Sequence, residues 1–167
     1  MILSACLPAP AGAATVYETQ AEFLARAFSD SPPDPKLLWL SGERKSAVRQ
    51  ILGHDYPALR LRYWCQADRS AWVLEEIGKE LPITVGIIID SSYIRNLRVL
   101  TYRENRGGEV ATPSFTDQFN DTALLGNGEL DTDIDGISGA TLSVKALTRL
   151  ATMALLLHTE SNCGSGA

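Results

Sequence analysis

The chain has 167 residues, of which 45% are hydrophobic, so it is long enough for one domain with a sizeable core and too short for two. Its formal net charge of −5 argues against nucleic acid or an anionic membrane surface as the main partner. No repeat or low-complexity block stands out, and no apolar run approaches the length that crosses a bilayer.

Residues 1–14 have the small, apolar composition that ends a secretory signal, and Ala11-Gly12-Ala13 fits the small-x-small cleavage rule. The run Leu3-Ser4-Ala5-Cys6 also fits a bacterial lipobox, which would make Cys6 a lipidated first residue. A charged start and most of the apolar centre of a signal are lacking, so an unstructured cytosolic terminus is a third interpretation. Of the three, we expect export, with the mature protein either soluble or lipid-anchored.

Two cysteines remain when Cys6 is set aside, Cys65 and Cys163. They form no thiol cluster and no metal-binding spacing, and this low cysteine count suits an exported protein. A disulfide between them is possible, but nothing in the sequence requires it.

The N-terminal half of the chain alternates helical and extended patterns. Apolar spacing in residues 17–28 predicts a short amphipathic helix, and the prolines of residues 29–35 end it and form a linker. The segments predicted after the linker are a strand at 37–40, a helix at 43–52 capped by Gly53, and period-two strands at 60–64 and 70–77 with a turn at 66–69.

The C-terminal half begins with a dense β-branched run, residues 83–89, which predicts a central strand buried on both faces. A turn and a further strand, residues 94–102, follow it. The last element is a helix at 142–158 that we expect to lie largely buried under the sheet. Lys145 and Arg149 interrupt its apolar pattern, so it is no membrane anchor. These elements predict an α+β fold, a twisted and mainly antiparallel sheet with packed helices.

Residues 135–141, Asp-Gly-Ile-Ser-Gly-Ala-Thr, stand directly before this last helix. A glycine turn that runs into a helix leaves backbone N–H groups free at about residues 139–142, and the helix dipole adds to this anion site. Thr141 places a hydroxyl inside the site, where a phosphate lying on the amides could be esterified. The ordinary alternative is a helix capped by Ser138 or Asp135.

The pattern Asp-x-x-Ser-Gly-Ala-Thr resembles the flavinylation motif of the FMN-binding domain family. This family includes a subunit of sodium-pumping NADH:quinone reductase and its relatives in ferredoxin-linked membrane complexes. In the family, a flavin transferase joins the FMN phosphate to the threonine as a phosphoester, which implies covalent FMN on Thr141 here and a flavin loop at the N-terminus of the last helix. The further cofactor-binding residues that the resemblance implies are Asp135, Ser138, Gly139, Ala140 and Leu142.

Two less specific features extend the resemblance to roughly residues 45–158. The 94–102 strand is followed by an acidic, glycine-containing loop at 104–109, and Phe115 to Phe119 matches a Phe-x-x-Gln-Phe run. Relatives carry Glu-Thr-Pro-Gly where this chain has Glu-Asn-Arg-Gly from residue 104, so the flavin contacts of the loop do not carry over directly. The resulting division is a terminal segment at 1–14, a helix and linker at 15–35, an FMN-binding domain at 36–160 and a flexible tail at 161–167.

Other candidate residues have ordinary interpretations. His54 and His158 lie at helix ends, where an imidazole is often only a dipole partner, so we assign no catalytic residue. Tyr93, Tyr102 and Trp72 could stack on an isoalloxazine ring, although core packing is the more common role.

Four acidic residues alternate before the motif, and one interpretation is a loop for a divalent metal. Because EF-hand spacing is lacking, we predict no metal and favour a solvated acidic loop. These residues are Glu129, Asp131, Asp133 and Asp135.

Together with the expected export, the resemblance implies an electron carrier that takes electrons from a membrane reductase and passes them to a periplasmic or other extracytoplasmic acceptor. The implied partners are a flavin transferase for maturation and these two redox proteins, without nucleic acid. Membrane contact would occur only through a partner or through a lipid on Cys6. The alternatives are a small flavin reductase with its own acceptor site and a non-redox accessory module of a membrane redox complex.

Overall fold

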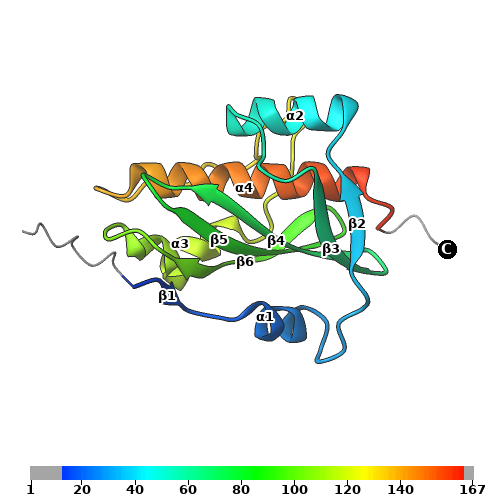
Figure 1. Ribbon diagram of the computed structural model, residues 1–167, viewed down its shortest axis with the longest axis horizontal. Coiled ribbons are helices and arrows are strands. Elements are labelled where there is room, and N and C mark those ends of the chain that lie inside the picture. The colour runs from blue at the N-terminus through cyan, green and yellow to red at the C-terminus, as the bar shows by residue number, and fades with distance from the viewer. Residues whose placement is uncertain (1–12, 164–167) are drawn as a thin grey trace, which may run out of the picture.

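Six strands form one antiparallel sheet in the order β1-β6-β5-β4-β3-β2, and helices cover both of its faces (Figure 1). The computed structural model describes residues 13–163. The strands are β1 (Thr15–Val16), β2 (Lys36–Trp39), β3 (Arg60–Gln66), β4 (Arg69–Ile77), β5 (Pro82–Asp90) and β6 (Tyr93–Tyr102). The helices are α1 (Gln20–Ala27), α2 (Gly42–Leu52), α3 (Pro113–Thr116) and α4 (Thr141–Glu160), with 3₁₀ turns η1 (Gly108–Ala111) and η2 (Asp117–Phe119). The predicted α+β class is confirmed.

Strand β5 lies inside the sheet, paired with β4 on one side and β6 on the other. Its side chains alternate between two cores: Ile87 and Ile89 belong to the larger cluster beneath α4, and Ile88 belongs to the smaller cluster beneath α1. The prediction of a strand buried on both faces is therefore confirmed, and it explains the run of β-branched residues.

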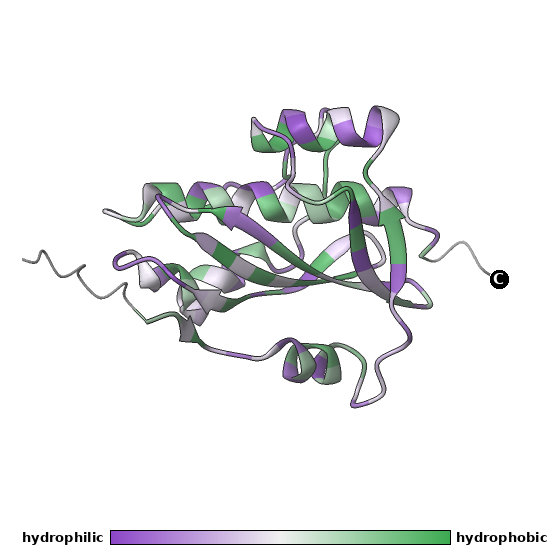
Figure 2. Cartoon of the chain, viewed as in Figure 1, coloured by the Kyte–Doolittle hydropathy of each residue, from purple (hydrophilic) through white to green (hydrophobic). Residues whose placement is uncertain are grey.

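The helices stack in layers around this sheet. Helix α1 covers one face, α4 covers the other, and α2 lies over the outer side of α4 (Figure 1). Figure 2 shows hydrophobic residues along much of α4 and a mixture of hydrophobic and hydrophilic residues on α2. Helix α2 ends where predicted, because Gly53 adopts the left-handed conformation (φ 82°) of a C-cap.

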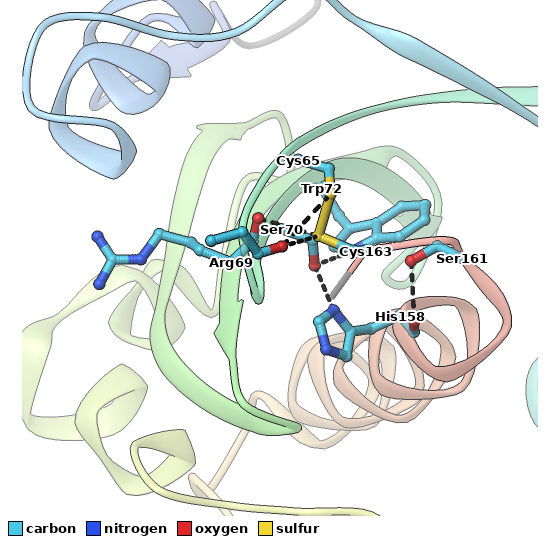
Figure 3. Close-up of a disulfide and its surroundings, with 8 residues drawn as sticks. Cys65, Arg69, Ser70, Trp72, His158, Ser161 and Cys163 are labelled. Carbon is cyan, nitrogen blue, oxygen red and sulfur yellow. Dashed lines mark hydrogen bonds between the residues drawn. A yellow bond between two sulfur atoms is a disulfide. The ribbon is translucent and has the colours of Figure 1, made fainter. Parts of the chain in front are cut away.

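The C-terminal end of α4 is fixed to the sheet by a disulfide between Cys65 of β3 and Cys163 (Figure 3). The pairing that the sequence left open is therefore formed. Residues 161–163, which we expected to begin a flexible tail, lie against the sheet, and Ser161 is buried. Nearby, Ser70 Oγ hydrogen-bonds His158 Nδ1 at 2.7 Å and accepts from Trp72 Nε1 at 2.8 Å.

Burial decides the roles of two residues in this network. Trp72 is fully buried and stacks on Tyr63 with ring centroids 4.8 Å apart, so it is a core residue and cannot meet a flavin. His158 is buried too, and loss of solvent lowers the pKa of its imidazole. It is thus a neutral hydrogen-bonding group at neutral pH.

The expected signal or lipobox, with Cys6, lies outside the described residues. Among residues 13–163, no helix is both long enough and apolar enough to span a bilayer.

Candidate functional site

The segment before α4 turns sharply into the helix. Gly139 has φ +83°, a left-handed conformation that favours glycine, and Ala140 is the N-cap. The helix begins at Thr141, one residue earlier than predicted. Since its first intrahelical hydrogen bond runs from Val144 N–H to Ala140 O, the N–H groups of residues 141–143 precede the ladder.

No side chain caps this end of α4. The alternative in which Ser138 or Asp135 caps the helix is therefore not what the structure shows. Alanine is a poor N-cap because it offers no acceptor to the free amides. Ala140 is only 4% exposed, whereas Ser138 and Thr141 are both exposed to solvent. The helix thus presents uncapped donors beside an accessible hydroxyl.

The loop after β6 packs against this helix end. Tyr102 Oη donates to Arg106 O at 2.5 Å and hydrogen-bonds Ser143 Oγ of α4 at 3.0 Å. Gly107 has φ +82°, and a Cβ there would lie 2.9 Å from Tyr102 Oη and 3.2 Å from Ala140 Cβ. Glycine is required for both reasons. Tyr102 is buried and connects the loop after β6 to α4, so its ring is not exposed for stacking on a flavin.

The carboxylate of Glu104 stabilises a second turn of the site, at residues 79–81. Its Oε1 accepts hydrogen bonds from the backbone N–H groups of Lys79, Glu80 and Leu81 at 2.6, 2.6 and 2.9 Å. Burial alone would raise the pKa of this carboxyl, but the three amides outweigh burial and lower it. The sequence indicates only an acidic loop around Glu104, because the amide partners of this carboxylate lie more than twenty residues away.

The Phe-x-x-Gln-Phe run fixes the motif from the other side. Phe115 and Phe119 are buried and pack edge to face, with centroids 5.8 Å apart. Gln118, between them, accepts a hydrogen bond from the Asp135 backbone N–H at 2.8 Å. The two aromatic rings therefore anchor a side chain that positions the first residue of the motif.

Two hollows adjoin the motif. One, of about 460 Å³, is lined by the Lys79–Glu80 turn, the loop after β6 and residues 139–143. The other, of about 610 Å³, is lined by residues 105–109, Thr112, Ser138 and Gly139. Both include Asn105, Arg106 and Gly139, so they meet beside the uncapped helix end.

A comparison with known protein families gives a match that covers this region. The family model described as FMN-binding domain matches residues 78–156, from the β4–β5 turn into α4, and the match includes the whole motif. These residues belong to the FMN-binding domain family. A comparison with curated proteins gives no match. The family match begins well after residue 45, where we expected the resemblance to start, so α2, β3 and β4 lie outside it.

The FMN-binding domain offers the groups that FMN requires. A phosphate needs hydrogen-bond donors and positive charge, and the open amides, the Thr141 hydroxyl, Arg106 and Lys79 lie around the same hollow. The volumes of the two hollows fall in the range of roughly 300–1,000 Å³ that is usual for small-molecule sites. The residues present therefore fit the cofactor.

Two residues named from the sequence, Tyr93 and His54, lie away from the motif. Tyr93 begins β6 and Tyr102 ends it, a separation of about 30 Å at roughly 3.3 Å per residue. Tyr93 is therefore too far from the motif to stack on the flavin. His54, after α2, is not a simple dipole partner, because its Nε2 lies 2.9 Å from Oε1 of the buried Glu76.

The His54 ring is held by two oxygen atoms. Nδ1 lies 2.9 Å from Asp55 O, and Nε2 meets the Glu76 carboxylate. A carbonyl and an ionised carboxylate only accept, so the protonated ring satisfies both, and these hydrogen bonds raise the pKa of His54. The acidic residues before the motif are solvent-exposed, and within residues 13–163 no three potential metal ligands gather.

Proposed function

We propose that this protein carries FMN covalently on Thr141 and transfers electrons outside the cytoplasm. The ester would form when Thr141 Oγ1 attacks the flavin-side phosphorus of a flavin dinucleotide. The P–O bond of the diphosphate breaks, and a nucleoside monophosphate leaves with the hydroxyl proton. A dedicated flavin transferase would make the bond. The loaded domain would then pass electrons from a membrane reductase to an extracytoplasmic acceptor.

One observation carries the proposal: an exposed threonine begins an uncapped helix inside a region that matches the FMN-binding domain. An acceptor side chain at this end would stabilise the protein by about 1 kcal/mol, and α4 lacks one. This helix has buried Ala140 there, packed close to Gly107. The phosphate oxygens supply the acceptors that the N-cap lacks.

The residues of the domain would have two roles, binding the phosphate and positioning the surrounding turns. Amides 141–143 and the neighbouring Ser138 and Gly139 would hold the phosphate, and Arg106 would add positive charge at the junction of the hollows. Gln118 and Glu104 would keep the surrounding turns in place through their hydrogen bonds to backbone amides. Bound FMN supplies the redox chemistry, since its ring accepts and donates one or two electrons.

The proposed location rests on the disulfide. A Cys65–Cys163 bond forms and persists in oxidising compartments and is rare in the cytosol. Covalent attachment suits the same setting, because it prevents loss of the cofactor where free FMN is scarce. Both features support a periplasmic or cell-envelope carrier.

Flavin fluorescence after denaturing electrophoresis tests the attachment. Protein co-produced with a flavin transferase should give a fluorescent band, which Thr141→Val should abolish and Thr141→Ser should retain in part. Thr159→Val, near the other end of α4, is the matched control and should leave the band unchanged. A fluorescent Thr141→Val band would contradict the assignment.

A second candidate, a flavin reductase with its own acceptor site, is favoured by one observation: two hollows adjoin the motif instead of one. Steady turnover of a small organic acceptor by the reduced protein would support it. Exchange only with protein partners would exclude it.

A further inference from the structure

A further hollow lies away from the flavin motif, between α2, α4 and the 124–134 segment. It has a volume of about 730 Å³. Figure 1 shows α2 lying over α4 on the side that faces away from the sheet. Helix α2 precedes the region matched by the family model, so this groove joins the FMN-binding domain to a part of the chain outside the match.

The groove is distinct from the flavin site. The α4 residues that line it begin at Thr148 and end at Leu156. Thr148 is seven residues from Thr141, or about 10 Å along the helix at roughly 1.5 Å per residue. The motif residues 135–141 do not line it.

The wall of the groove is substantially apolar. Five of its residues are hydrophobic side chains that are only partly buried and pack against the main core. They come from all three segments, so apolar side chains of a ligand can contact hydrophobic residues on each of them. These residues are Ile51, Leu124, Leu130, Ile134 and Leu156.

The charge of the groove comes mainly from the 124–134 segment. Residues 104–135 contain eight acidic residues and one basic residue, a net charge of −7, so the rest of the chain carries +2 of the total of −5. Glu129 and Asp133 line the groove, and neither forms an ion pair within residues 13–163. The basic lining residue, Arg149, lies beside the C-cap of α2, where a Cβ on Gly53 would be 3.6 Å from its Nη2, so the charged lining residues carry a net charge of −1.

We propose that this groove binds a basic, amphipathic segment of a partner protein. Apolar side chains of the segment would occupy the space beneath α2, and its lysines or arginines would meet Glu129 and Asp133. Attraction between the two charged surfaces would also speed the encounter. The site does not require flavin, so it is tested separately from Thr141.

The test uses the full chain, with and without FMN, and a 14-residue helical peptide that has leucine on one face and lysine on the other. Amide chemical shifts in ¹⁵N-labelled protein should change mainly at residues 124–134 and along α2 and the middle of α4. Affinity should fall steeply as salt is raised. A peptide with glutamate in place of lysine should bind at least tenfold more weakly.

A pair of adjacent variants on α2 separates groove binding from general charge attraction. Ala47 lines the groove and Ser46 does not, so Ala47→Arg fills the groove while Ser46→Arg adds the same charge outside it. Ala47→Arg should weaken peptide binding about tenfold or more. Ser46→Arg should weaken it less than about threefold, the scale of an exposed charge.

Three outcomes would overturn the proposal. Equal effects of Ala47→Arg and Ser46→Arg would show that the peptide follows charge alone. Shift changes confined to residues 138–143 would move binding to the flavin motif. A stable dimer that Ala47→Arg dissociates would show that a second copy of the chain occupies the groove.

Discussion

Removal of the Cys65–Cys163 disulfide should destabilise the protein strongly. The bond links residues 98 apart in sequence, so it restricts most of the unfolded chain. The chain-entropy relation for a closed loop of this length gives about 4.7 kcal/mol of stabilisation at 25 °C, and native disulfides in small domains contribute about 2–5 kcal/mol. We expect Cys65→Ser/Cys163→Ser to lose about 3–5 kcal/mol.

Urea unfolding followed by tryptophan fluorescence measures this loss, because Trp72 stacks in the core next to the disulfide network. The melting temperature should fall by roughly 6–20 °C, at about 2–4 °C per kcal/mol for a chain of this size. The m-value should rise, since an unlinked unfolded chain exposes more surface. Native protein in reductant is the control and should match the double variant.

A loss below about 1 kcal/mol, with an unchanged m-value, would refute this reasoning. It would mean that the link between β3 and the end of α4 does not restrict the unfolded chain. It would also weaken the support that the disulfide gives to an oxidising compartment.

Three further predictions concern packing, protonation and the motif. Gly86→Ala should lower the free energy of unfolding by about 1–3 kcal/mol, because its Cβ would lie 2.7 Å from the Phe23 ring. Gly126→Ala is the control: a Cβ there meets nothing within 4 Å, so it should have little effect in the same urea titration. The pKa of His54 is raised in the folded protein, so the stabilisation that its protonation gives is complete below the unfolded pKa of about 6.5 and is lost as pH rises through the folded pKa. His54→Gln should remove this step from a plot of the free energy of unfolding against pH. An unchanged plot would contradict the prediction. Gln118→Ala should speed hydrogen exchange at the start of the motif and lower the flavinylated fraction several-fold, and unchanged exchange would show that its hydrogen bond does not order the loop.

Periodic patterns predicted the elements that are buried on a regular face. The β-branched run became β5 because a strand covered on both sides needs apolar residues at every position. The long apolar pattern became α4, displaced by one residue at its start and two at its end. Gly53 ended α2 because its left-handed conformation is a local property that the residue type reveals.

Contacts between distant residues could not be predicted in the same way. Glu104 meets three amides more than twenty residues away, and no local pattern marks such a partner. The disulfide depended on where α4 ends relative to β3, which the fold alone decides. The pairing of His54 with buried Glu76 has the same origin.

Part of the motif's structure could be predicted from local sequence, and part depends on contacts with distant residues. Its sequence indicated an anion site at a helix start but left open whether Ser138 or Asp135 caps the helix. The structure decides this through the conformation of Gly139 and the burial of Ala140 against the loop after β6. The groove beneath α2 was not foreseen, because it needs the packing of three segments that are far apart in sequence.

The intact mass of the purified protein tests the central claim most directly. The protein would be produced in an exporting host with and without a flavin transferase, beside Thr141→Val. We predict a gain of one FMN less one water that requires both the transferase and Thr141. An unmodified, colourless protein from the host that contains an active transferase would contradict the account.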